Sequence, residues 1–143
     1  MKIIIDDRED GDFVTKLIVS LTGKDKEIDA EVKRLKIGDY VCGDVCVERK
    51  TIDDFCLSIM DGRIKSQAEQ MKANYKYCYV LISGRIGDRT TEINENCILG
   101  AISSLVVAGL NVVCVDDSKQ LIFLMKRIFE RHSPIELKRR YKK

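Results

Sequence analysis

The chain has 143 residues, the size of one compact domain, and hydrophobic residues make up 45% of it. Charged residues make up 34%, but the net charge is only +2, so the overall charge does not by itself indicate a nucleic-acid-binding protein. The N-terminus turns acidic directly after Ile5, and no apolar stretch is long enough to cross a bilayer. These features exclude a secretory signal and a membrane protein. They predict an intracellular protein, in the cytoplasm of a prokaryote or the nucleus of a eukaryote.

The six cysteines do not show the paired spacing of a metal-binding or redox motif. None forms a CxxC pair, and His132 is the only histidine. A zinc site needs four convergent ligands, whereas most of these cysteines lie among valine, isoleucine and leucine. We therefore expect small, buried, reduced thiols in a reducing compartment.

Apolar periodicity, capping residues and turn signals predict alternating strands and helices. In chain order they are a strand at 2–6, a helix beginning at Asp10 or Asp12 and stopped by Gly23, strands at 27–36, 37–42 and 45–50, a helix capped by Thr51, a helix at 63–75, a strand at 77–83, a helix at 94–108, a strand at 111–115, and a helix at 118–132. Continuous apolar strands separated by helices predict an α/β fold with a mixed central sheet flanked by helices.

The two strands around Gly43-Asp44 form a predicted hairpin that brings acidic residues together. With these residues in the turn, paired positions sum to 87, which places Asp39 opposite Glu48. Cβ atoms of directly opposite residues lie about 4.5–5.5 Å apart, so the two carboxylates repel unless a cation lies between them. Mg²⁺ prefers one or two carboxylates together with water and phosphate, which suits this pair.

Lys50 is two residues after Glu48 on the same strand, so both side chains point to the same face. An ammonium group there can stabilise negative charge on a reacting phosphate or hold the attacking water. The alternative is a charged surface hairpin whose acids are simply solvated.

Further polar residues follow the first strand and open the helix at 63–75. Asp6 or Glu9 is expected to complete the metal shell, because ligands gather at strand ends in α/β sheets. The alternative is helix capping by the acids between positions 7 and 12. Arg63 and Gln67 are i, i+4 neighbours that could bind phosphate or a base; an exposed polar face is the other interpretation.

The sequence resembles the XPF-type structure-specific endonucleases, whose ERCC4-like nuclease domain also occurs in archaeal Hef. The motif GD-xn-ERK-x3-D is present as Gly38-Asp39, Glu48-Arg49-Lys50 and Asp54. The segments Ile5-Asp6-Asp7-Arg8-Glu9 and Ser58-Ile59-Met60-Asp61-Gly62-Arg63, followed by Gln67, resemble two further motifs of the family. The resemblance covers nearly the whole chain. One departure is Ser83-Gly84, where relatives often carry an acid.

The resemblance implies a restriction-endonuclease-like core and Mg²⁺- or Mn²⁺-dependent cleavage of branched DNA, such as 3′ flaps and forks, near the junction of duplex and single strand. It implies that Asp39 and Glu48 bind metal and that Lys50 is catalytic. Arg49 and Asp54 would belong to the same catalytic set. Together with Asp6, Arg8 and Arg63, they would support the site or hold DNA. Asp54 also has the position of the N3 residue in a helix cap.

The family also dimerises through this domain, and the helices at 94–108 and 118–132 are the expected interface, with an identical or a related subunit. The alternative is that their apolar stripes serve only the core. Residues 1–133 would form the nuclease domain, and the basic tail at 134–143 would either contact phosphate or lead to the helix-hairpin-helix domain that relatives usually carry. Two other functions remain open: a non-catalytic DNA-binding subunit and a junction resolvase on the same core.

Overall fold

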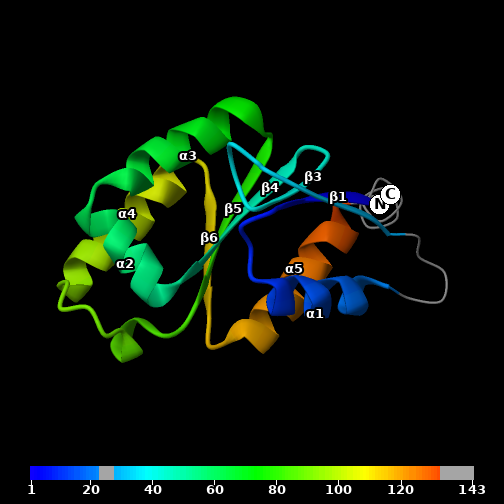
Figure 1. Ribbon diagram of the computed structural model, residues 1–143. Coiled ribbons are helices and arrows are strands. Elements are labelled where there is room, and N and C mark those ends of the chain that lie inside the picture. The colour runs from blue at the N-terminus through cyan, green and yellow to red at the C-terminus, as the bar shows by residue number, and fades with distance from the viewer. Residues whose placement is uncertain (23–27, 133–143) are drawn as a thin grey trace, which may run out of the picture.

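The fold is a six-stranded mixed sheet with helices on both faces, seen in a computed structural model that describes residues 1–22 and 28–132 (Figure 1). The strands are β1 (Lys2–Asp6), β2 (Asp29–Lys33), β3 (Tyr40–Cys42), β4 (Val45–Thr51), β5 (Tyr77–Ser83) and β6 (Asn111–Val115). Their order across the sheet is β2-β1-β3-β4-β5-β6. The predicted helix stop at Gly23 and the predicted basic tail lie outside the described residues.

Five helices cover the sheet in two layers, which Figure 1 shows on opposite sides. They are α1 (Gly11–Leu21), α2 (Ile52–Met60), α3 (Arg63–Asn74), α4 (Glu95–Val107) and α5 (Ser118–Arg131). One hydrophobic cluster joins α2, α3 and α4 to the sheet, and a second joins α1 and α5 to its other face. Within the described residues, no helix has both the length and the apolar character needed to span a bilayer.

The strand pairing explains which parts of the sheet are buried. β3 runs antiparallel to β1 and β4, and β4, β5 and β6 run parallel to one another. β5 lies between β4 and β6 and is mostly buried, as its continuous apolar run predicts. β2 is an edge strand whose five residues are all exposed, and its charged side chains are typical of a strand that must not pair further.

The predicted order of elements is confirmed, and two strands are shorter than predicted. β2 ends at Lys33 because the chain turns there, and the backbone N–H of Leu35 donates to the Asp6 carboxylate instead of a sheet partner. β3 begins only at Tyr40 because Gly38 has a left-handed backbone, with φ of +77°, which interrupts the strand. A short 3-10 helix at Ile86–Asp88 was not predicted.

The predicted hairpin register is confirmed at three pairs, which are Tyr40 with Val47, Val41 with Cys46, and Cys42 with Val45. The ladder stops there, one pair before Asp39 and Glu48. The backbone N–H of Asp39 donates to the carbonyl of Val47 at 2.9 Å, so the chain shifts by one residue at that point. The two acids therefore meet at the end of the hairpin and not within its regular ladder.

Gly38 is the position where this arrangement tolerates least change. A Cβ atom there would lie 2.3 Å from the Cys46 sulfur, and the left-handed backbone adds strain. We expect Gly38→Ala to lower the free energy of unfolding by about 2 kcal/mol or more, measured by urea denaturation. Gly87→Ala is the control, because nothing lies within 4 Å of its Cβ position and a loss below about 0.5 kcal/mol is expected. Equal effects of the two substitutions would contradict this role of Gly38.

Candidate functional site

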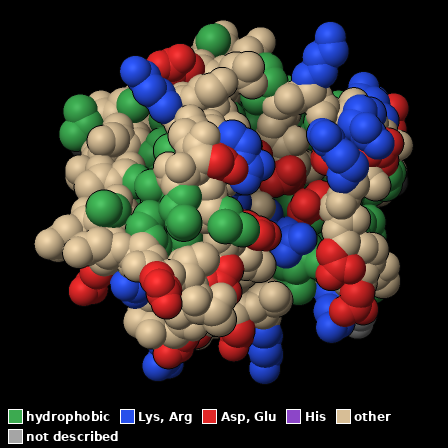
Figure 2. All heavy atoms as spheres, turned by 60° about the vertical axis from the view of Figure 1, so that its left-hand side comes forward, with side chains coloured by type: hydrophobic (Ala, Val, Ile, Leu, Met, Phe, Trp, Pro, Cys, Tyr) green, Lys and Arg blue, Asp and Glu red, His purple; other side chains and the backbone are tan. Residues whose placement is uncertain are grey.

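The predicted acids line a polar hollow between the β1–α1 loop, the start of β3, β4 and α3. Its cavity volume is about 350 Å³. Figure 2 shows acidic and basic side chains meeting in a recess of the surface beside a patch of apolar side chains. The hollow is lined by Asp6, Arg8, Glu9, Lys36, Ile37, Gly38, Asp39, Glu48, Gln67, Gln70 and Met71.

Asp39 is held in the hollow from three sides. Its backbone N–H donates to Val47 of β4, and its carbonyl accepts from Asp6 N–H at 2.8 Å. Its side-chain Oδ2 accepts the backbone N–H of Arg49 at 2.8 Å. The side chain therefore occupies the place that a continuing strand would take beside β4, which orients the carboxylate.

Glu48 and Lys50 lie on the same face of β4, as their spacing predicts. The Lys50 Nζ lies 3.5 Å from Glu48 Oε1 and donates to Ser58 Oγ at 3.1 Å. Ser58 is fully buried in α2, and its hydroxyl donates to the carbonyl of Asp54 at 3.0 Å. Only 8% of the Lys50 side chain is exposed, so this ammonium is held in one place rather than free in solvent.

The two acids destabilise each other's charged form. Burial raises the pKa of Asp39, and the negative charges of Glu48 and Glu9 raise it further. Burial also raises the pKa of Glu48, although the nearby Lys50 ammonium opposes that shift. A pair of carboxylates with raised pKa values is short of positive charge, and a divalent cation supplies such charge.

Asp6 lies at the rim of the hollow with both oxygens engaged. Arg8 donates from Nε to Oδ2 at 2.9 Å and from a terminal nitrogen to Oδ1 at 3.2 Å, and Leu35 N–H donates to Oδ1 at 2.9 Å. Burial works against ionisation, but these donors outweigh it and lower the pKa of Asp6. In this arrangement Asp6 clamps the chain after β2. Its predicted role as a metal ligand stays a prediction.

Arg49 points to the opposite face of the sheet from Glu48 and Lys50. Its Nε donates to Glu9 Oε1 at 2.8 Å, and its guanidinium lies 4.2 Å from the centre of the Phe13 ring. Burial opposes its charge, but the bond to Glu9 more than compensates, and the pKa of Arg49 is raised.

The remaining predicted residues are not all brought together. Gln67 lines the hollow, and its side-chain oxygen is buried without a hydrogen-bond partner. Arg63 is exposed and pairs with Asp61 at 2.7 Å, away from the hollow lining. Asp54 is also exposed, and its N–H donates to Thr51 Oγ1 at 3.1 Å, which confirms its position in the helix cap.

Two residues that contact this site had no role in the sequence-based predictions. Ser58 was noted only as the first residue of a motif, and Phe13 was not singled out. A serine four residues after Asp54, on the same face of the helix as the apolar Phe55, is a usable signal for Ser58. No signal in the sequence indicates the contact between Phe13 and Arg49, because it depends on how α1 packs.

The donor set of the hollow fits a magnesium-like cation. Asp39 and Glu48 supply hard oxygen ligands, and Mg²⁺ usually takes only one or two carboxylates. Within residues 1–22 and 28–132, no group of three or more histidine, cysteine or acidic side chains has the arrangement of a metal site. Any bound cation would therefore complete its shell with water or substrate oxygens.

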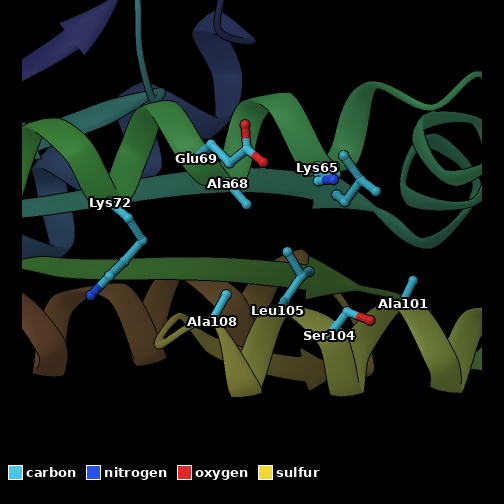
Figure 3. Close-up of a pocket in the computed structure, with 9 residues that line it drawn as sticks. Lys65, Ala68, Glu69, Lys72, Ala101, Ser104, Leu105 and Ala108 are labelled. Atoms are coloured by element: carbon cyan, nitrogen blue, oxygen red, sulfur yellow. The ribbon is translucent and has the colours of Figure 1, made fainter.

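A second hollow, of about 680 Å³, lies between α3 and α4 (Figure 3). Figure 3 shows Ala68 and Leu105 facing each other across it, with Lys72 reaching along one end. Glu69 is the only acid in its lining. The α3 residues that line this second hollow differ from those that line the polar hollow. Although it is larger, it lacks converging acid and base groups. The polar hollow is the better candidate for chemistry.

Comparisons with known proteins agree with the fold and the motif. The profile of the family described as the ERCC4 domain matches residues 5–128. A protein of Methanocaldococcus jannaschii, named as a candidate ATP-dependent RNA helicase, is 32% identical over 133 residues, covering 92% of this chain and 16% of that protein. The 3′-flap repair endonuclease Xpf of Saccharolobus solfataricus is 28% identical over 134 residues, covering 92% of this chain and 55% of that protein.

Among solved structures, XPF from Aeropyrum pernix superposes with a TM-score of 0.78 at 25% sequence identity. The match covers 91% of this chain and 64% of that one. The present chain therefore spans only part of the length of these relatives. The agreement confirms the predicted α/β core.

The raised pKa of Asp39 has a measurable effect on stability. When a carboxyl group binds its proton more tightly in the folded than in the unfolded state, the protein loses stability as pH rises. The loss runs from about pH 4 toward the pKa of that group in the folded state. Without metal, we expect the wild type to lose at least about 1 kcal/mol relative to Asp39→Asn between pH 5 and pH 8. Urea denaturation of both proteins measures this difference. Other titrating groups, such as His132, contribute to both proteins, so their contributions cancel. A difference that stays constant with pH would contradict the shift.

Proposed function

We propose that this chain, which belongs to the ERCC4 domain family, is the nuclease domain of a divalent-metal-dependent DNA endonuclease that cleaves branched DNA. The observation that carries the proposal is the pair of half-buried acids, Asp39 and Glu48, beside a buried lysine that α2 holds in place. Chance surface charges would not be buried and engaged in this way.

Asp39 and Glu48 would hold Mg²⁺ or Mn²⁺ in the polar hollow. When bound, such a cation supplies a more acidic water and positive charge near the scissile phosphate. The chain's own contribution is to fix the ligands. Arg49 N–H orients the Asp39 carboxylate, and the shift in register at Gly38 places it at the end of the hairpin.

Lys50 would act on the phosphate or on the attacking water. Its ammonium lies at the same face as Glu48 and is tied to Ser58, so it needs little reorganisation to meet developing negative charge. Arg8 and Gln67 also line the hollow and would hold DNA there. Arg8 already pairs with Asp6, so its exposed side chain would add a phosphate contact to an existing ion pair.

The substrate class follows from the relatives. The Saccharolobus relative is named for 3′-flap repair, and a Dictyostelium discoideum relative, 33% identical over 108 residues, is named for crossover junctions. This chain covers only 12% of the length of the Dictyostelium relative. Both names concern DNA with branches, so we propose forks and 3′ flaps as substrates in DNA repair or replication-fork processing.

Two copies of the domain, or this domain and a related one, would assemble through the face around β6. Among the described residues this strand pairs only with β5, and α4 and α5 lie on either side of it. Leu99, Val106 and Phe123 on these helices are 48%, 52% and 63% exposed, which is unusual for large apolar side chains of a monomer surface. Burying them against a partner would remove this apolar area from water.

The catalytic proposal predicts that Asp39→Asn and Lys50→Ala each slow cleavage at least about a hundredfold while the fold stays intact. A labelled fork and a labelled 3′ flap are cut in Mg²⁺, in Mn²⁺ and in EDTA, with circular dichroism as the test of folding. Asp44→Asn is the matched control, since this acid lies exposed in the turn of the same hairpin. It should cut at the wild-type rate.

Cleavage that persists in EDTA, or wild-type rates in Asp39→Asn, would contradict the proposal. Binding of the fork without any cleavage by the wild type would instead favour a non-catalytic DNA-binding subunit.

The assembly proposal predicts that the wild type sediments as a dimer at micromolar concentration and that Phe123→Glu combined with Val106→Ser sediments as a monomer. Each copy of the variant would carry a negative charge and less apolar area at this face, which would remove the driving force for association. Val19→Ser is the control, because Val19 is an exposed apolar residue of α1, a helix outside the proposed face. A wild type that stays monomeric would exclude a homodimer through this face.

A further inference from the structure

The side chain of Arg49 is largely covered on the side of the sheet that carries α1, and it points away from Glu48 and Lys50. In a strand, consecutive side chains point to opposite faces. Lys50 contacts Ser58 of α2 on one side, whereas Arg49 contacts Phe13 of α1 on the other. Although the three consecutive motif residues look like one cluster in the sequence, the middle one is turned away.

Two residues hold the Arg49 guanidinium. Glu9, in the loop between β1 and α1, accepts its Nε at 2.8 Å, and these two side chains are only 11% and 16% exposed. Phe13, in the first turns of α1, presents its ring 4.2 Å from the guanidinium carbon and is itself 4% exposed. Removing one partner of such a shielded ion pair leaves the other charge unpaired, which is costly, and the cation–π contact adds attraction to the same guanidinium.

The backbone of Arg49 reaches the other way, into the site. Its N–H donates to Asp39 Oδ2 at 2.8 Å, so a single residue connects α1 with the orientation of the acid. A small displacement of β4 at Arg49 would lengthen the bond that orients this carboxylate.

We propose that Glu9 and Phe13 are positioning residues that act through Arg49. They anchor its side chain behind the sheet so that its backbone N–H holds the Asp39 carboxylate, and the guanidinium itself does not touch substrate. This assigns Arg49 a different role from the catalytic one that the family motif implies. The consequence for cleavage rests on the proposed function, whereas the anchoring of the N–H does not.

The anchoring is tested without any activity. Hydrogen exchange followed by NMR measures the protection of the Arg49 amide in the wild type, Glu9→Gln and Phe13→Leu. We expect both substitutions to speed exchange of this amide by about tenfold while the amides of β5 keep their rates. Lys16→Ala is the matched control, because it breaks an exposed ion pair on the same helix and should change neither rate.

Equal acceleration at Arg49 and throughout β5 would mean that Phe13 and Glu9 only stabilise the fold, and it would overturn the proposal. So would an unchanged Arg49 amide in both variants. Because neither outcome involves DNA, this experiment decides the anchoring even if the wild type does not cleave.

A second measurement tests the role of the guanidinium. On forked DNA, we expect Arg49→Lys and Glu9→Gln to lower kcat by about tenfold with unchanged DNA affinity and unchanged salt dependence of binding. The double variant should lose little more than either single one, since both break the same contact. A weaker affinity together with a smaller salt slope in Arg49→Lys would place its guanidinium on a DNA phosphate and overturn the proposal.

Discussion

The repulsion between Asp39 and Glu48 is the constraint on which the rest of the site depends. Both carboxylates are largely withdrawn from solvent at the end of one hairpin, and their pKa values are raised as a result. Such a pair persists only if donors and positive charge surround it. The N–H of Arg49 and the ammonium of Lys50 supply part of that compensation. The remainder is what a divalent cation would provide under the proposed function.

The two faces of the sheet have different roles, since one carries the polar hollow and the other supports β4. On the face of α2 and α3, the acids, Lys50 and Ser58 form the polar hollow, and on the face of α1 a buried ion pair and an aromatic ring support the strand from behind. Because β4 lies within the sheet, between β3 and β5, its backbone is held by hydrogen bonds on both sides. Rigid support of this kind keeps ligand geometry within the narrow limits that catalysis needs.

Much of the fold was predictable because its signals are local. The structure confirms the elements predicted from three local signals. These are the nearly all-apolar run at β5, the cap at Thr51 and the turn at Gly43-Asp44. The predictions failed where a distant contact intervened. β3 was expected to start at position 37, but Gly38 packs against the Cys46 sulfur and turns the chain. β2 was expected to continue to position 36, but Asp6 takes the N–H of Leu35.

For the site, the sequence by itself determined that Asp39, Glu48 and Lys50 would lie together, because hairpin pairing and strand alternation follow from covalent spacing over a few residues. Only the tertiary structure decided which groups surround them. Arg49 donates to Glu9, which lies 40 positions away in the sequence, and Arg8 donates to the Leu35 carbonyl, which lies 27 positions away. The partners of buried charges are set by how helices pack on the sheet. That packing depends on side-chain shape throughout both cores and leaves no local pattern in the sequence.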